Sequence, residues 1–349
     1  MKREVLLCIF LFFQVLFCHA QDYSKGQVRV EKLLAKALQG NRGGENPVRS
    51  ITVYLPPGYN EGNKRYPVIY YLHGFAWNDS LLIAQDHLDQ LLDKAIAAGK
   101  IRETVVVMPD HHTLYRGSYF TNSSLTGNWA DFTAREVVTF IDKNYRTIPD
   151  KNSRGLAGHS MGGYGALKLV MQYPDVFGAV YAMSPAKLDW GKEYTIDNSA
   201  FKMISTAKTR EEILENMAAT AYIAMGRVYS PNPQKPPFYC DLPVSYEGDR
   251  KVVNYDVLAK WEKQSPTRMV SSHVKELKGL NALKLDWGRN DPFPHIPVTS
   301  LQFSQELEAY GISHYAEEYI GDHVNKLWTP DGRAYNDMLP FFETYLKFE

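Results

Sequence analysis

The sequence contains little cysteine. Only three of its 349 residues are cysteines, and two of them, Cys8 and Cys18, lie among the first twenty residues. If that N-terminal stretch is removed, Cys240 remains alone and no internal disulfide can form. The mature chain must then be stabilised by its hydrophobic core, and about 330 residues are enough for one large domain, with or without an insertion.

The chain also has no excess of charge of either sign, no repeats and no low-complexity tracts. It has 39 Lys and Arg residues against 39 Asp and Glu residues. A balanced charge gives no bulk attraction to nucleic acid or to an anionic membrane. We therefore expect no nucleic-acid partner, and we expect the ligand to be a small or neutral molecule.

No apolar run at the N-terminus is long enough for a membrane span. The largely apolar stretch from Val5 to Phe17 is shorter than the about 20 residues that a transmembrane helix needs. It follows Lys2 and Arg3, and the small residue Ala20 comes shortly after it, as in a signal peptide. We predict that residues 1–20 are cleaved, that the protein is periplasmic or secreted, and that no stable membrane anchor remains.

Beyond residue 48, short apolar runs alternate with helical patterns. Strand signals lie at Ile51–Leu55, Val68–Leu72, Thr104–Met108, Arg154–Ala157, Ala179–Met183, Ala282–Trp287 and Tyr315–Ile320. Helical spacing appears at Leu82–Ala98, Ala134–Tyr145, the stretch YGALKLVM, Val298–Tyr310 and Tyr335–Leu346. This alternation predicts an α/β fold, in which a mostly parallel sheet is covered by helices on both faces. Residues 49–349 form this domain, and the polar residues 21–48 are predicted to be a leader on its surface.

The segment of about 187–280 breaks the alternation. It shows no clear strand, only helical pieces at Thr209–Met225 and Tyr255–Gln264 and the proline-rich stretch PNPQKPPFYCDLP. One crossover does not need this length, so we predict a helical cap over the carboxyl edge of the sheet. Its large side chains could form a pocket wall: Trp190, Tyr194, Tyr222, Tyr229, Phe238, Tyr239, Tyr246, Tyr255 and Trp261. Phe238 and Tyr239 lie in the irregular stretch, and we predict that they contact substrate because loops often carry binding residues.

The sequence GHSMG, residues 158–162, has the pattern GxSxG. It follows the apolar strand RGLA and precedes the apolar helix YGALKLVM, which is the context of the nucleophile elbow of the α/β-hydrolase fold. In that elbow a serine occupies a tight turn between strand and helix, and glycines on both sides leave room for it. We therefore predict that Ser160 is a nucleophile.

A serine hydroxyl needs a base at neutral pH, and in this fold the acid and then the histidine follow the serine along the chain. Four histidines lie downstream of Ser160: His273, His295, His314 and His323. His323 comes just after a predicted strand, on the loop where the base must lie, so it is the predicted base. His295 is the alternative, because it lies near the candidate acid.

The acid is predicted to be Asp291. It lies in GRNDPFPH, directly after the strand LKLDW, where its carboxylate can reach His323. Asp286 lies within the strand and is the second choice. Asp322 is adjacent to the histidine, where it cannot easily bond its neighbour's ring, and is expected to shape the loop.

Backbone N–H groups must bind the oxyanion of an acyl-transfer intermediate. One donor is expected from Met161, directly after the nucleophile. The second is expected from Phe75, in the sequence YYLHGF, in which His73 and Gly74 shape the loop.

No metal site can be recognised. Asp110, His111 and His112 form a cluster, but adjacent side chains diverge and no second pair has ligand spacing. We expect these residues to line the mouth of the site, and we expect neither a metal nor a cofactor.

Several segments together resemble the esterase D or putative-esterase family. They are YPVIYYLHGF, VVVMPD, the segment from Trp129 through FIDKNYRTIPD, and AGHSMGGYGALKLVMQYP with FGAVYAMSP. The resemblance is dense over residues 48–186 and looser over 280–349. It implies an α/β-hydrolase fold with a triad formed by Ser160, Asp291 and His323. The segment 187–280 is larger than in small members of the family, which leaves the substrate open.

The function expected from these features is a secreted serine carboxylic ester hydrolase that forms an acyl-enzyme. Resemblance to feruloyl and acetylxylan esterases implies esters linked to plant polysaccharides, such as feruloyl or acetyl esters, and Trp129 is predicted to contact them together with Phe238 and Tyr239. Three alternatives remain: an acyltransferase using the same triad, a peptidase using the same triad, and a non-catalytic binding protein on this scaffold.

Overall fold

The computed structural model of the protein describes residues 24–349. The predicted signal peptide, residues 1–20, lies outside the described residues. Within residues 24–349, none of the helices combines the length and the apolar character that a membrane span requires.

The centre of the molecule is an eight-stranded sheet with the strand order β1-β2-β4-β3-β7-β8-β11-β12. The strands are β1 (Gln27–Leu34), β2 (Val48–Leu55), β3 (Val68–Leu72), β4 (Val105–Pro109), β7 (Arg154–His159), β8 (Ala179–Met183), β11 (Ala282–Gly288) and β12 (Tyr315–Tyr319). From β4 to β12 neighbouring strands are parallel, whereas β1 and β2 pair antiparallel and β2 is antiparallel to β4. The predicted α/β fold with a mostly parallel sheet is confirmed.

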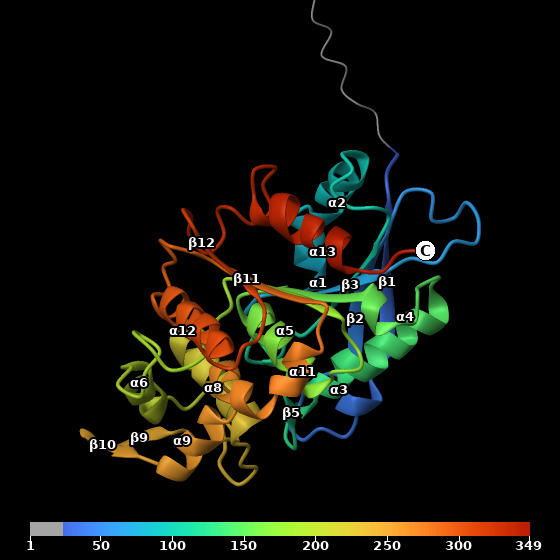
Figure 1. Ribbon diagram of the computed structural model, residues 1–349. Coiled ribbons are helices and arrows are strands. Elements are labelled where there is room, and N and C mark those ends of the chain that lie inside the picture. The colour runs from blue at the N-terminus through green and yellow to red at the C-terminus, as the bar shows by residue number, and fades with distance from the viewer. Residues whose placement is uncertain (1–23) are drawn as a thin grey trace, which may run out of the picture.

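Helices cover both faces of this sheet (Figure 1). One face carries α1 (Asp79–Ala84), α2 (Leu88–Ala97) and α13 (Leu339–Tyr345), and the other carries α3 (Trp129–Asp131), α4 (Val138–Asn144), α5 (Met161–Gln172) and α12 (His295–Ala309). A π-helical stretch, Phe132–Val137, joins α3 to α4, and a second one, Ala334–Met338, leads into α13. Every residue of β3 and β4 is buried, which explains their continuous apolar sequences.

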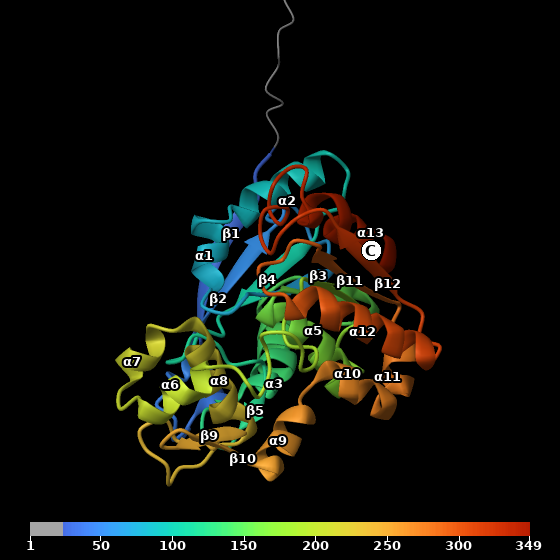
Figure 2. The same ribbon diagram turned by 90° about the vertical axis from the view of Figure 1, so that its left-hand side faces the viewer.

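The segment between β8 and β11 lies on the face that carries α5, away from α2 and α13 (Figure 2). Its helices are α6 (Ala200–Thr206), α7 (Arg210–Leu214), α8 (Met217–Tyr229), α9 (Tyr255–Glu262), α10 (Pro266–Met269) and α11 (Val274–Lys278). It also contains a hairpin formed by β9 (Val244–Glu247) and β10 (Arg250–Val253), which the sequence analysis did not predict. A second small hairpin, β5 (Asn122–Ser123) with β6 (Gly127–Asn128), precedes α3.

Two other features differ from the prediction. The predicted surface leader contains β1, which pairs with β2 over its whole length. Because its side chains are largely exposed, its sequence carries no strong burial signal. The single helix predicted at Leu82–Ala98 is two helices, α1 and α2. They are separated at His87, whose φ of 51° lies in the left-handed region, and the carboxylate of Asp86 in this break accepts a hydrogen bond from Trp77 Nε1 at 2.8 Å.

Candidate active site

Ser160 lies in the turn between β7 and α5. Its φ and ψ are 57° and −117°, a conformation that non-glycine residues rarely adopt. Three backbone hydrogen bonds hold it there: Ser160 N–H donates to the carbonyl of Met183, and the carbonyl of Ser160 accepts from the N–H groups of Tyr164 and Ala186, each at 3.0 Å. A strained backbone that its surroundings hold in place is typical of functional sites.

The glycines of the motif are required by close backbone contacts. A Cβ atom at Gly162 would lie 1.9 Å from the carbonyl oxygen of Leu72, and one at Gly158 would lie 2.3 Å from the backbone of Gly162. No side chain fits at either position. The turn therefore brings α5 directly against the end of β3.

Asp291 and His323 are joined by a short hydrogen bond. Asp291 follows β11 and His323 follows β12, and these strands are parallel neighbours, so both loops leave the same edge of the sheet. His323 Nδ1 donates to Asp291 Oδ2 at 2.6 Å, and Asp291 Oδ1 accepts from the N–H of Phe293 at 2.9 Å. Because the Nδ1 proton is held by the carboxylate, the Nε2 atom of the neutral ring is left free to accept a proton.

Asp286 and His295, the alternative acid and the alternative base, each bond to other side chains. Asp286 is fully buried and accepts hydrogen bonds from the Tyr181 hydroxyl at 2.6 Å and from Arg333 Nε at 2.8 Å. His295 pairs through Nδ1 with Glu193 at 2.6 Å. Neither of these residues takes part in the Asp291–His323 pair.

The remaining candidates near the base also have defined partners. His314 contacts Ser304, and His273 bonds the carbonyl of Met269. Asp322 accepts hydrogen bonds from two N–H groups of its own loop through Oδ1, as expected of a loop-shaping residue.

His159, which the sequence analysis did not single out, supports the loop of His323. Its Nε2 donates to the carbonyl oxygen of His323 at 2.8 Å, and the two ring centroids are 4.5 Å apart. Burial, followed by the charge of His323, lowers the pKa of His159 well below its usual value, so its ring stays neutral. The only sequence signal was its place directly before the nucleophile.

The loop after β3 packs directly on the nucleophile. A Cβ atom at Gly74 would lie 3.5 Å from Ser160 Cβ, and both Phe75 and Met161 line the cavity into which Ser160 faces. His73 stabilises this loop, because its Nδ1 donates to the carbonyl of Gly74 and its Nε2 accepts from the N–H of His111, both at 2.8 Å. Burial lowers the pKa of His73, which favours the neutral ring that this bonding pattern requires.

Ser160 and His323 line one cavity of about 600 Å³. Within residues 24–349 no hydrogen bond links the Ser160 hydroxyl to His323. Aromatic and other apolar side chains form most of the wall, including Tyr119, Tyr194, Tyr222, Phe293, Trp77 and Trp328. This size and lining suit a small organic ligand.

A comparison with protein families identifies the group to which the chain belongs. The family model described as "Putative esterase" matches residues 46–331, well over half of the chain. The chain belongs to this esterase family. The resemblance noted in the sequence is thereby confirmed.

Individual relatives are similar over shorter stretches. An endo-1,4-beta-xylanase/feruloyl esterase of Xylanibacter ruminicola is 35% identical over 144 residues, which are 38% of this chain and 19% of that protein. An esterase of Mycobacterium tuberculosis is 33% identical over 150 residues, 42% of this chain and 30% of that protein. The matched part of this esterase-family chain thus spans less than a third of the length of these curated relatives.

Solved structures match the whole domain. A ferulic acid esterase superposes with a TM-score of 0.64 at 22% identity and covers 93% of this chain and 99% of its own. An S-formylglutathione hydrolase from Agrobacterium tumefaciens superposes with a TM-score of 0.59 at 15% identity, covering 93% and 96%. These likenesses show that this member of the esterase family has the α/β-hydrolase fold.

The predicted substrate contacts of this esterase-family chain were Phe238, Tyr239 and Trp129. This prediction needs correction, because none of these residues lines the cavity of Ser160. Phe238 packs edge-on against Tyr115, with ring centroids 6.5 Å apart. Tyr239 is 38% exposed. Trp129 is fully buried in the core against Phe132. The wall is formed instead by aromatic residues such as Tyr194, which the chain brings in from the start of the segment after β8.

The expectation for His111 and His112 is also corrected, since neither lines the cavity. His111 is fully buried between hydroxyl groups of Ser118 and Thr133, each 3.0 Å from a ring nitrogen. Burial lowers its pKa well below the usual value. His73, His111 and His159 are together called the three buried histidines below. Over the described range, no three His, Cys, Asp or Glu side chains gather as metal ligands would.

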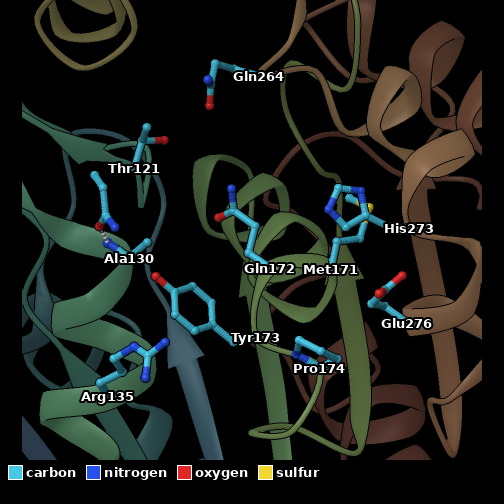
Figure 3. Close-up of a pocket in the computed structure, with 11 residues that line it drawn as sticks. Thr121, Ala130, Arg135, Met171, Gln172, Tyr173, Pro174, Gln264, His273 and Glu276 are labelled. Atoms are coloured by element: carbon cyan, nitrogen blue, oxygen red, sulfur yellow. Dashed lines mark hydrogen bonds between the residues drawn. The ribbon is translucent and has the colours of Figure 1, made fainter.

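A second cavity of about 640 Å³ lies at the opposite end of α5 (Figure 3). Gln172 and Tyr173 line it at the end of that helix, between Arg135 on one side and His273 on the other, and Gln264 lies across the cavity from them. The guanidinium of Arg135 lies 5.4 Å from the centre of the Tyr173 ring. None of the candidate catalytic residues lines this cavity.

Proposed function

We propose that the protein is a serine carboxylic ester hydrolase in which Ser160 is the nucleophile, His323 the base and Asp291 the residue that orients the base. One observation carries the proposal: His323, which is paired with the buried Asp291, lines the same cavity at the carboxyl edge of the sheet as the strained Ser160 turn. Membership of the esterase family supports it.

In the proposed reaction, Ser160 Oγ attacks the ester carbonyl while His323 Nε2 takes its proton. The electron pair of the carbonyl moves to oxygen, and the N–H groups of Phe75 and Met161 stabilise the resulting oxyanion. The imidazolium then gives its proton to the departing alcohol, which leaves the acyl group on Ser160. Water, deprotonated by His323, releases the acid in the same way. Asp291 holds the ring in the productive tautomer and stabilises its charged form.

The proposed substrates are feruloyl or acetyl esters of plant polysaccharides. The relative from Xylanibacter ruminicola is named a feruloyl esterase, and a structurally similar feruloyl esterase module from Clostridium thermocellum was solved with sinapinate. The apolar wall of the cavity, which includes the rings of Trp77, Tyr194 and Phe293, fits a flat aromatic acyl group. The signal-like N-terminus supports export to the periplasm or the medium, where such polymers occur.

A panel of substrates tests the proposal on the protein that begins at Gln21. It contains 4-nitrophenyl acetate, methyl ferulate, acetylated xylan, S-formylglutathione and a peptide amide. We expect turnover of esters but not of the amide, and we expect Ser160→Ala to lower kcat on 4-nitrophenyl acetate by several orders of magnitude with an unchanged melting temperature.

Other outcomes would identify the alternatives. Cleavage of the amide would indicate a peptidase, and transfer to an added alcohol in preference to water would indicate an acyltransferase. Binding of esters without turnover would indicate a non-catalytic binding protein. More than a few per cent of activity left in the Ser160→Ala variant would exclude Ser160 as the nucleophile.

A further inference from the structure

Asp86 places a carboxylate in the wall of the candidate active site. It is half-buried and lines the same cavity as Ser160 and His323. It lies in the break between α1 and α2, where its N–H donates to the carbonyl of Leu81 at 3.2 Å and the next residue, His87, has a φ of 51°. A left-handed residue other than glycine costs free energy, and such residues gather at functional sites. The chain thus leaves the helical path at the point where Asp86 meets the cavity.

Three aromatic residues line the cavity beside this carboxylate. Asp86 Oδ2 accepts a hydrogen bond from Trp77 Nε1 at 2.8 Å. The ring of Trp328 packs edge-on against that of Tyr71, with ring centres 5.1 Å apart. Because Trp77, Trp328 and Tyr71 all line the cavity, the rings and the carboxylate border the same space as the nucleophile.

The carboxylate has no cationic partner from the chain itself. Among residues 24–349, no Lys or Arg side chain pairs with Asp86, and none lies over the ring of Trp77 or Trp328. By contrast, the half-buried Asp142 pairs with Arg154. Burial raises the pKa of Asp86, although hydrogen bonding to the two indoles and the charge of its neighbour His87 oppose this effect. A cation held beside Asp86 would offset the cost of burying its charge.

From this arrangement we infer that this part of the cavity binds an ammonium group of the substrate, with the carboxylate of Asp86 as its counter-ion and the rings of Trp77 and Trp328 beside it. Aromatic rings attract cations, and proteins use them to recognise ammonium ligands. The inference rests on the proposed ester hydrolase function. It adds a substrate class, esters that carry a positive charge, which feruloyl and acetyl esters do not include.

An ammonium group fits this site better than a hydroxyl group does. A hydroxyl can also donate a hydrogen bond to Asp86, but it leaves the negative charge uncompensated beside apolar side chains such as Leu82 and Leu327, which line the same cavity. An ammonium group compensates that charge and is also attracted by the indole rings. The site should therefore distinguish an ammonium group from a hydroxyl or a methyl group of similar size.

The test uses two sets of esters that differ only at the group in question. One set carries it on the acyl part: methyl 6-aminohexanoate, methyl 6-hydroxyhexanoate and methyl heptanoate. The other carries it on the alcohol: acetylcholine and its uncharged isostere 3,3-dimethylbutyl acetate. We expect the wild type to prefer the cationic ester by about tenfold or more in kcat/KM in at least one set. The set that shows the preference identifies which part of the substrate reaches Asp86.

Asp86→Asn separates the charge from the hydrogen bond, because the amide oxygen can still accept from Trp77 Nε1. This variant should reduce the preference to about twofold or less, through a loss on the cationic ester alone. Asp93→Asn is the matched control. Asp93 is a buried carboxylate that accepts from the Tyr54 hydroxyl at 2.8 Å and from the N–H of Gly26 at 2.7 Å, but it does not line the cavity. Its replacement should leave the preference as it is in the wild type.

Binding provides a readout that does not depend on turnover. Calorimetry on the Ser160→Ala variant should show a Kd lower by about fivefold or more for the preferred cationic ester than for its uncharged isostere, and the additional Asp86→Asn substitution should remove this difference. The inference is overturned if the wild type prefers no cationic ester, if Asp86→Asn keeps the preference, or if that variant loses activity equally on all esters. A preference for the hydroxy ester would overturn the assignment of an ammonium group. Failure of the wild type to hydrolyse even 4-nitrophenyl acetate would refute the proposed function, and the calorimetry would then decide the inference alone.

Discussion

Replacing Asp291 by asparagine changes one atom in the hydrogen-bond chain of the candidate active site. In the wild type both carboxylate oxygens accept: Oδ2 from His323 Nδ1 at 2.6 Å and Oδ1 from the N–H of Phe293 at 2.9 Å. The side chain of Asp291 is fully buried, so water cannot replace either partner. An amide has one accepting oxygen and one donating nitrogen, and it cannot satisfy both donors at once.

The orientation of the new amide follows from this mismatch. If its oxygen faced His323 Nδ1–H, its NH₂ group would face the N–H of Phe293, and two buried donors would oppose each other. The backbone N–H cannot change, whereas the imidazole can move its proton to Nε2. The amide oxygen should therefore bond Phe293, and its NH₂ group should donate to Nδ1. The ring is then locked in the tautomer that cannot accept the proton of Ser160.

The expected loss of activity is large because His323 stays in place but can no longer act as a base. An incorrect tautomer at such a triad lowers kcat by about 10⁴, which corresponds to roughly 5 kcal/mol in the activation free energy. Because the bond to Phe293 is kept and the shape is unchanged, the melting temperature should change little. The assay is turnover of 4-nitrophenyl acetate, with ¹⁵N NMR of the His323 ring to identify the tautomer.

Asp286→Asn is the matched control. Asp286 is also fully buried at β11, but its partners are Tyr181 and Arg333 rather than a histidine. We expect this variant to keep kcat within about threefold and to lose about 1–3 kcal/mol of unfolding free energy. The reasoning is refuted if Asp291→Asn keeps more than a tenth of the wild-type kcat, or if Asp286→Asn is the more severe of the two in activity.

Three further predictions concern the base, the elbow and the response to pH. His323→Ala should lower kcat about 10⁴-fold and His295→Ala less than about tenfold, and the reverse order would make His295 the base. Gly162→Ala should prevent folding or cost more than about 3 kcal/mol, since its Cβ would lie 1.9 Å from the Leu72 carbonyl; a soluble variant with wild-type melting temperature would contradict this. The three buried histidines have pKa values lowered from 6.5, so below that pH the unfolded chain binds protons that the folded chain does not. Unfolding free energy, measured in urea, should therefore fall from pH 7.5 to 5.5, by up to about 4 kcal/mol per pH unit if all three contribute. His159→Gln should reduce that slope, and equal stability at both pH values would disprove the argument.

The central strands and the position of the nucleophile motif could be predicted from the amino-acid pattern alone. Val68–Leu72 and Ala179–Met183 were predicted with the bounds that the structure has, because each is a continuous apolar run between turn-forming residues and is buried on both faces. The turn around Ser160 was predictable for a similar reason: Gly158 and Gly162 are required by contacts within a few residues and with one adjacent strand.

Which side chains meet in the cavity could not be predicted in this way, because it depends on how the chain packs. Tyr194 and Tyr222 line it, whereas Phe238, from a more irregular stretch, packs elsewhere. Composition and spacing do not distinguish these outcomes, because a cavity wall depends on how distant elements pack. The bond from His159 to the backbone of His323 joins residues 164 positions apart and has no local signature. The pattern of apolar residues along one strand or helix shows which of its faces is buried, whereas the pocket arises from contacts between elements that are distant in the sequence.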